Sequence, residues 1–193
     1  TMNEGGLIGL SNGVCTITNT SVSVDVYGSN AGGFVGINKY QLSINDCYYG
    51  GTSEISAFGV YGYISSGGMV GTQNAAVTIS KSAVKNATIG IPSALNDSVG
   101  IGGYVGIKAN GDLKITDCEV NNVTLSAEDK SNGAGAGGVI GHNDRGSTYA
   151  YDILINRLSY QKGNENVSVS NLIGWNNDKN LSSKFIGLSV NNT

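Results

Sequence analysis

The sequence predicts an all-β protein, a parallel β-helix (β-solenoid) of about five to six coils, with three short strands in each coil of about 35 residues. Three observations predict this fold. A glycine-rich motif recurs at nearly constant spacing, alternating apolar segments follow each copy, and no segment has the 3.6-residue apolar stripe of an amphipathic helix. The composition agrees: 30 Gly, one Pro and only 13% charged residues among 193 exclude a coiled coil and collagen.

The recurring motif reads Gly-Gly-x-Val/Ile-Gly. Its copies begin near residues 5, 32, 67, 102, 137 and 170, and the sixth, Ser170-Asn171-Leu172-Ile173-Gly174, is degenerate. The successive spacings are 27, 35, 35, 35 and 33 residues. Because each repeat forms one coil of a solenoid, we treat residues 1–193 as a single solenoid domain.

The last glycine of the motif forms a column through the stack. Its members are Gly9, Gly36, Gly71, Gly106, Gly141 and Gly174. Glycine permits positive φ and close backbone approach, so we expect a stacked corner of the coil at this position.

Two alternating segments follow each motif, as expected for half-buried strands. An antiparallel sandwich also has many short strands, but it would not explain why every third strand is similar in sequence. The third segment of each coil is expected at Val22–Val26, Ile55–Ile64, Ala87–Ile91, Val123–Leu125 and Val167–Val169. One inward column should contain Ile17, Ile44, Ile79, Ile115 and Ile155; a second, Cys15, Leu42, Val77, Leu113 and Ile153; a third, Val22, Tyr49, Val84, Val120 and Tyr160.

An outward column should lie beside these. It would contain Asn19, Asp46, Lys81, Asp117 and Arg157, of which the last four alternate in charge. Adjacent coils lie about 4.8 Å apart, so we expect an exposed charge ladder that helps to specify register.

The three cysteines are expected to be free thiols. Cys47 and Cys118 share one slot two coils apart, about 9.6 Å, which exceeds the reach of a disulfide. Cys15 occupies a different, apolar slot. The spacing fits no zinc site, and we expect no metal and no cofactor.

Seven Asn-x-Ser/Thr sequons are possible glycosylation sites. With 23 Asn, 22 Ser and 12 Thr in the chain, chance would give roughly four. An Asn-rich polar surface is therefore an equal alternative to a glycoprotein. The sequons begin at Asn19, Asn86, Asn96, Asn122, Asn166, Asn180 and Asn191.

The charge pattern argues against two classes of partner. The net charge is -3 with no basic run, so no nucleic acid is expected. No apolar stretch approaches about 18 residues, so no membrane insertion is expected.

The motifs resemble the GLUG-type repeats, in which Gly-Gly-x-Val-Gly precedes an Ile/Val-x-x-Cys strand. The resemblance covers Gly5 to about Val190. It implies a β-helix spacer or adhesive stalk of a bacterial surface protein, and therefore an extracellular or cell-surface structural module that is not an enzyme. Since the chain begins and ends within the repeat pattern, we expect either neighbouring solenoid repeats or end-to-end self-association into a filament.

The alternative function is a carbohydrate-binding or polysaccharide-degrading β-helix. Degradation would need clustered carboxylates, and the best cluster is His142-Asn143-Asp144-Arg145, which also reads as a solvated polar turn. Glycan binding would use aromatic platforms, although several of these residues also read as members of the stacked columns. The candidate aromatics are Tyr40, Tyr48, Tyr61, Tyr63, Tyr104, Tyr149, Tyr151 and Trp175.

Overall fold

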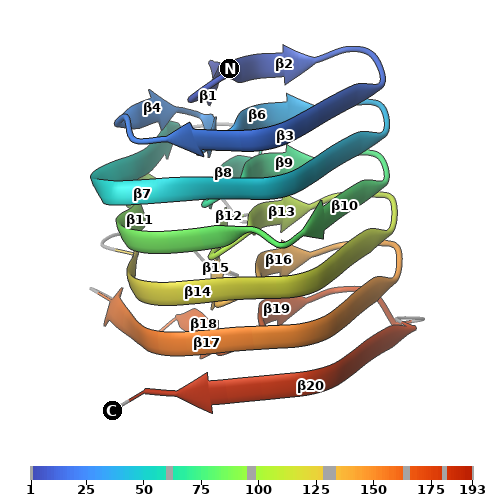
Figure 1. Ribbon diagram of the computed structural model, residues 1–193. Coiled ribbons are helices and arrows are strands. Elements are labelled where there is room, and N and C mark those ends of the chain that lie inside the picture. The colour runs from blue at the N-terminus through green and yellow to red at the C-terminus, as the bar shows by residue number, and fades with distance from the viewer. Residues whose placement is uncertain are drawn as a thin grey trace.

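The computed structural model describes residues 2–59, 63–94, 99–127, 134–162, 166–179 and 182–192. The described residues form a parallel β-solenoid without helices, which confirms the predicted fold class. The coils stack from the N-terminus at one end to the C-terminus at the other (Figure 1). Every strand pairing is parallel, so each sheet runs along the solenoid axis and takes strands from successive coils.

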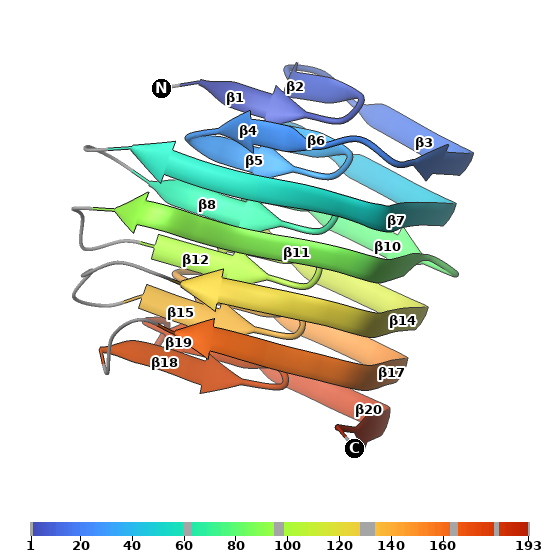
Figure 2. The same cartoon turned by 90° about the vertical axis from the view of Figure 1, so that its left-hand side faces the viewer.

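Two of the three sheets have six strands each (Figure 2). Sheet A contains β1 (Asn3–Gly5), β5 (Asn30–Gly32), β8 (Ile64–Gly67), β12 (Val99–Gly102), β15 (Ala134–Gly137) and β18 (Val167–Ser170). Sheet B contains β2 (Ile8–Ser11), β6 (Val35–Asn38), β9 (Val70–Gln73), β13 (Val105–Lys108), β16 (Ile140–Asn143) and β19 (Ile173–Asn176).

The third sheet, sheet C, holds the long strands that wrap around the rest of each coil. It contains β3 (Cys15–Val22), β4 (Val26–Gly28), β7 (Leu42–Gly59), β10 (Val77–Ser80), β11 (Ala83–Ala94), β14 (Leu113–Ala127), β17 (Thr148–Lys162) and β20 (Ser183–Asn191). In the first and third coils two strands, β3 with β4 and β10 with β11, take the place of one long strand.

The predicted apolar columns are confirmed through the first four coils. Ile17, Ile44, Ile79 and Ile115 pair in register, and all four are buried. The column of Val22, Tyr49, Val84 and Val120 is likewise buried and in register. These side chains form a continuous core that no single coil could bury alone.

The prediction for the fifth coil was wrong by several residues. Ile115 pairs with Ala150, and Leu113 pairs with Thr148. The residues assigned to those columns lie further along the strand: Ile153 pairs with Cys118, Ile155 with Val120, and Tyr160 with Leu125. The repeat keeps its 35-residue step here, but small Ala150 and polar Thr148 occupy the core slots, and the more apolar segment after them suggested a false alignment.

A related correction concerns the segment Val167–Val169. It forms β18 of sheet A and pairs with β15, so it is not the third alternating segment of its coil. That position belongs to Leu158–Tyr160, which pairs with Val123–Leu125.

The glycine motif brings sheets A and B into backbone contact. The column glycines lie inside the strands of sheet B, not at a corner, and none has positive φ. A Cβ on Gly71 would lie 2.6 Å from the Gly36 carbonyl oxygen and 2.9 Å from that of Ala31, in sheet A. A Cβ on Gly106 would lie 2.7 Å from the Ser66 nitrogen. Close approach, the second expected role of these glycines, is therefore the one that the structure uses.

Sheet C turns at two columns of residues in the left-handed region of φ. The first column has φ between 48° and 68° and contains Asn19, Asp46, Lys81, Asp117, Asp152 and Gly187. The second has φ between 51° and 69° and contains Thr52, Asn86, Asn122 and Arg157. Asn, Asp and Gly tolerate this conformation better than other residues, which explains their frequency at these corners.

A side chain directly after the first corner column closes the turn. The Ser82 Oγ donates to the Ser80 carbonyl oxygen at 2.7 Å, and the Cys118 Sγ donates to that of Thr116 at 3.1 Å. In the same way, the Thr20 Oγ1 donates to the Thr18 carbonyl oxygen at 2.8 Å, and the Cys47 Sγ donates to that of Asn45 at 3.2 Å. At the position shared by Cys47, Ser82 and Cys118, the side chain therefore donates a hydrogen bond that closes the corner. The thiols of Cys47 and Cys118 are free and buried, as expected. Cys15 is also free, although only half-buried.

Candidate functional site

The polar cluster predicted at His142-Asn143-Asp144-Arg145 lies at the end of β16 and in the bend that follows, and only part of it is solvated. His142 and Asn143 are buried, Asp144 is half-buried and Arg145 is exposed. The His142 Nε2 lies 2.9 Å from the Asp144 Oδ1, and the Asn177 amide of the next coil lies within 3.0 Å of both groups. The His142 Nδ1 is buried without a partner among the described residues. We therefore assign the proton to Nε2, which donates to Asp144, because a buried N–H at Nδ1 would have no acceptor.

A polar groove of about 530 Å³ opens beside this cluster. It is lined by Tyr63, Asn74, Ala109, Asp144, Arg145 and Asn177. Partial burial, followed by the nearby Asp144 carboxylate, raises the pKa of Tyr63. Asp144 is the one carboxylate among the described lining residues. The arrangement can hold a polar ligand through hydrogen bonds, whereas hydrolysis by two carboxylates would need a second one at the groove.

The neighbouring turn is held by a buried lysine. The Lys108 Nζ donates to the Asn143 Oδ1 at 3.1 Å and to the carbonyl oxygens of Arg145, at 2.6 Å, and Gly146. Burial lowers its pKa to about 8, although Asp112 and Asp178 act in the opposite direction. In the coil before it, Gln73 occupies the same slot and donates to the carbonyl oxygens of Gly111 and Asp112. This column is structural, since its side chains satisfy turn carbonyls of the following coil.

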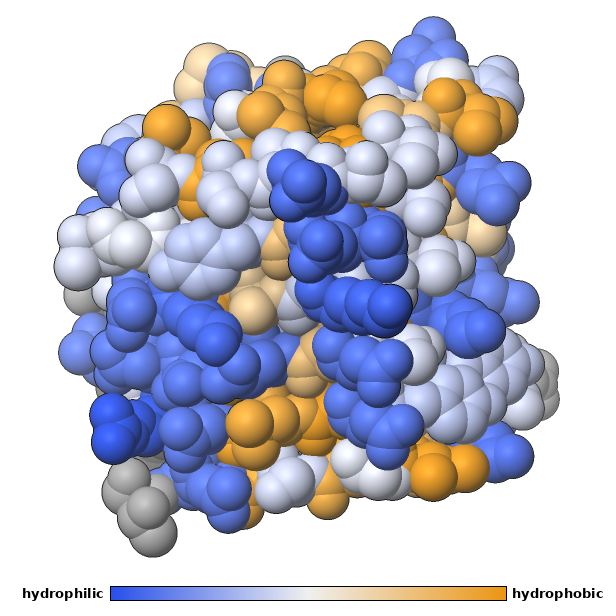
Figure 3. Space-filling view, in the orientation of Figure 1, coloured by the Kyte–Doolittle hydropathy of each residue, from blue (hydrophilic) through white to orange (hydrophobic). Residues whose placement is uncertain are grey.

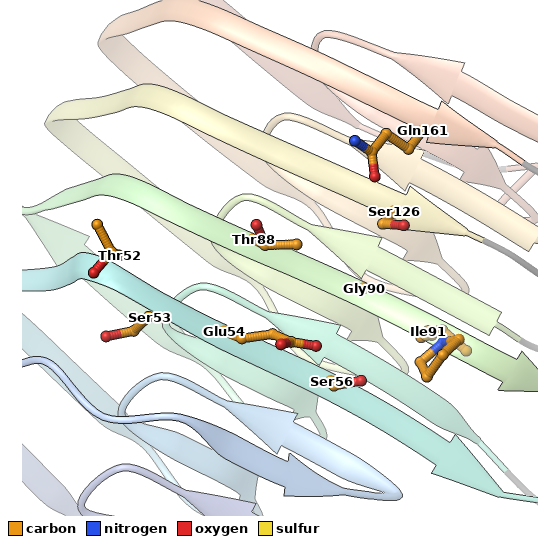
Figure 4. A pocket seen from close by; sticks show the side chains of 10 residues that line it. Thr52, Ser53, Glu54, Ser56, Thr88, Gly90, Ile91, Ser126 and Gln161 are labelled. Atoms are coloured by element: carbon orange, nitrogen blue, oxygen red, sulfur yellow. The ribbon is translucent and has the colours of Figure 1, made fainter.

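A second groove, of about 250 Å³, crosses four coils on the last segment of sheet C (Figure 4). It is lined by Thr52, Ser53, Glu54, Ser56, Thr88, Gly90, Ile91, Pro92, Ser126 and Gln161. The sequence did not predict this groove. A sequence pattern that could have indicated the groove is a pair of outward-facing small or hydroxyl residues that recurs in the third alternating segment. The pair occurs in Thr88-Ile89-Gly90 and again in Thr124-Leu125-Ser126.

Three of the predicted glycosylation sites have a structural explanation. Asn19, Asn86 and Asn122 are exposed and occupy the left-handed corner columns. The Asn122 amide donates to the Asn86 Oδ1 at 2.8 Å, between adjacent coils. Asn166 and Asn191 are exposed, whereas Asn96 and Asn180 lie outside the described residues. Since corners favour Asn and strands after them favour Ser and Thr, the fold itself produces sequons.

Three members of the predicted charge ladder share one column, and the fourth lies elsewhere. Asp46, Lys81 and Asp117 are exposed and follow one another at the first corner. The next position is Asp152, because Tyr151 pairs with Thr116. Arg157 belongs to the second corner column, beside Asn122. In the described part of the chain no ion pair joins the ladder residues, and an inter-coil ion pair forms instead between Lys85 and Glu119.

The candidate aromatic platforms differ in access. Tyr104 is fully buried, and burial raises its pKa well above the usual value, so it belongs to the core. Tyr40 and Tyr63 are exposed, and Tyr61 lies outside the described residues. The four others are half-buried: Tyr48, Tyr149, Tyr151 and Trp175.

The described ranges lack two features. No group of three or more His, Cys, Asp or Glu side chains is arranged to hold a metal ion. No helix there has the length and apolar character needed to cross a membrane.

Comparison with protein-family models, curated proteins and solved structures finds no match to this chain.

Proposed function

We propose that the protein is a structural β-solenoid module of a secreted or cell-surface protein, and that copies of it stack end to end in register. The observation that carries this proposal is the character of the two end faces. Within the described ranges, each strand of the first coil, β1 to β4, pairs with a single neighbour, and so do β18, β19 and β20 in the last coil. Such edges present unpaired backbone groups to another strand.

The end coils also carry most of the exposed large hydrophobic residues in the described ranges. Nine of the twelve exposed large hydrophobic residues in the described ranges lie there, six in the first coil and three in the last. They are Met2, Leu7, Leu10, Val14, Val24 and Tyr27, and Val169, Ile186 and Val190. In the space-filling view, hydrophobic atoms gather mainly at the top and bottom of the stack (Figure 3). Apolar surface of this kind favours association.

The two end faces are complementary in register. Suppose that the first coil of a second copy lies on the last coil of this chain, with their first corner columns aligned. Ile17 of the second copy would then stack on Phe185, and its Val22 would stack on Val190. Asn19, with φ of 48°, would stack on Gly187, with φ of 68°. Both apolar pairs extend columns that already run through the molecule. A second copy of the chain therefore fits this face by the same contacts that join its own coils.

The proposed cell-surface setting has a separate basis. It rests on the resemblance of the glycine motif to GLUG-type repeats. The polar, Asn-rich corners of sheet C suit a stalk that presents a hydrated surface.

Sedimentation velocity over a range of concentrations tests the stacking. We expect the average mass to rise with concentration, and the variant Thr16→Pro to remain monomeric. The Cys15 N–H bonds to the second coil, so the N–H of Thr16 in the same strand points to the free edge. Thr16→Ala keeps that donor and should associate like the wild type. A wild-type monomer at the highest concentration would refute the proposal.

A further inference from the structure

The groove on the last segment of sheet C runs along the solenoid axis. Its floor consists of Ser56, Gly90 and Ser126, which pair in register across three coils. The column continues to Tyr27 at one end and Gln161 at the other. Five positions span four inter-strand steps, or about 19 Å.

The floor presents two hydroxyl groups to the groove. Ser56 and Ser126 are 4% and 7% exposed, and both line the groove. Neither hydroxyl forms a hydrogen bond within the described part of the chain, whereas the nearby Ser53 donates to the Gly50 carbonyl oxygen at 3.2 Å. Neither oxygen belongs to the buried polar atoms without a partner, so both remain accessible from the groove. These two are therefore placed to bond a molecule in the groove.

Gly90 keeps the centre of the floor open. A Cβ at this position would lie 3.0 Å from the Ser126 carbonyl oxygen and 3.1 Å from the Ser126 Cβ, so a side chain would crowd the floor between the two hydroxyls. Thr88 and Glu54 lie on one side of the floor (Figure 4), and Ile91 and Pro92 complete the lining. The result is a shallow channel that admits a narrow, extended ligand.

The chemistry of the walls restricts the ligand further. Glu54 is the one charged side chain among the described lining residues. At the same end, Tyr27 lies in register with Ser56 and is 50% exposed, so its ring face is available for stacking. The negative charge of Glu54 is the main cause that raises the pKa of Tyr27, which agrees with an acidic environment at this end.

We propose that this groove binds a neutral oligosaccharide, extended along the solenoid axis across the floor hydroxyls of Ser56 and Ser126. Each hydroxyl can both donate and accept, as sugar hydroxyls require. The inter-coil spacing, about 4.8 Å, is close to the length of one pyranose unit, so successive sugars would meet successive coils. The Tyr27 ring stacks on an end sugar, and Glu54 repels uronic acids.

Isothermal titration with linear tetrasaccharides tests the site, using cellotetraose, mannotetraose, xylotetraose and, as the acidic probe, tetragalacturonate. At least one neutral probe should bind, and tetragalacturonate should bind about tenfold more weakly or not at all. Ser126→Leu fills the floor and should abolish binding. Ser56→Ala with Ser126→Ala removes the hydroxyls without filling the groove, and should weaken binding about tenfold.

Thr78→Leu is the matched control, because Thr78 is a half-buried strand residue of sheet C outside the groove, and it should bind like the wild type. Thermal unfolding shows whether each variant is folded. Two results would overturn the proposal: equal binding by the wild type and the double Ala variant, or no binding of any neutral glycan in an array and in titrations at millimolar concentration. Neither result bears on end-to-end stacking, because the substituted serines lie outside the end coils, although Tyr27 contributes to both surfaces.

Discussion

The interface between sheets A and B differs from sheet C in how it is packed. Between sheets A and B, backbone lies against backbone, and the motif glycines leave no room for a Cβ. Sheet C instead packs side-chain columns inward and turns at residues with positive φ. The sequence repeats closely where backbones touch and varies where side chains face solvent. The first region therefore specifies the fold, and the second is free to acquire a binding surface.

The largest expected effect is a side chain placed between sheets A and B. Gly71→Ala would bring a Cβ within 2.6 Å of the Gly36 carbonyl oxygen, and neither backbone can move without disturbing the stack. We expect a loss of about 3 kcal/mol in the free energy of unfolding, or failure to fold. Gly13→Ala is the control, since a Cβ there meets nothing within 4 Å, and its effect should stay within about 0.5 kcal/mol. Urea denaturation measures both, and equal stabilities would contradict the packing argument.

The second effect is a pH dependence from Lys108. Its folded-state pKa of about 8 lies below the usual lysine value of 10.5, chiefly because the group is buried. Between these values the unfolded chain holds a proton that the folded chain has released, so this group makes stability rise with pH. The rise amounts to at most about 3 kcal/mol.

The variant Lys108→Met isolates this contribution from the tyrosines and cysteines that titrate in the same range. The stability of the wild type relative to the variant should increase as the pH rises from about 8 to about 10.5. Denaturation curves at several pH values give the difference. Parallel profiles for the two proteins would show that Lys108 keeps an ordinary pKa.

A smaller effect is expected at the first corner of sheet C. Cys118→Ala removes the donor to the Thr116 carbonyl oxygen and should cost about 1 kcal/mol. Cys118→Ser restores a donor, as Ser82 does in the preceding coil, and should lie closer to the wild type. Thermal unfolding ranks the three proteins. If Ala and Ser were equivalent, the contact would have no energetic role.

The smallest effect concerns the like charges at the same corner. Asp152 follows Asp117 in the column, and Asp152→Asn should stabilise the protein by about 0.5 kcal/mol, because Asn also tolerates positive φ. Asp46→Asn is the control, since its neighbours are Asn19 and Lys81, and it should be neutral or slightly destabilising. The gain at Asp152 should shrink in high salt.

The sequence predicted the repeat, the solenoid and most inward columns, because stacked strands require similar residues at a fixed period. It did not predict the fifth-coil register, where Ala150 and Thr148 fill core slots and a more apolar segment competes with them. Nor did it predict the groove, because Ser56 and Ser126 are ordinary outward residues until the fold places them beside Gly90. A site built from residues one coil apart has no local signature.

The most direct test of the proposed stacking is a disulfide between copies. In a chain with its native cysteines replaced by serine, Thr18→Cys and Ile186→Cys place two exposed thiols at matching positions of the two end faces. In-register stacking would bring them to about 4.8 Å, within the range that a disulfide needs. Oxidation should therefore yield a ladder of covalent multimers, whereas the mismatched pair Thr16→Cys and Ile186→Cys should not. Absence of the ladder, or equal ladders from both pairs, would contradict register-specific stacking.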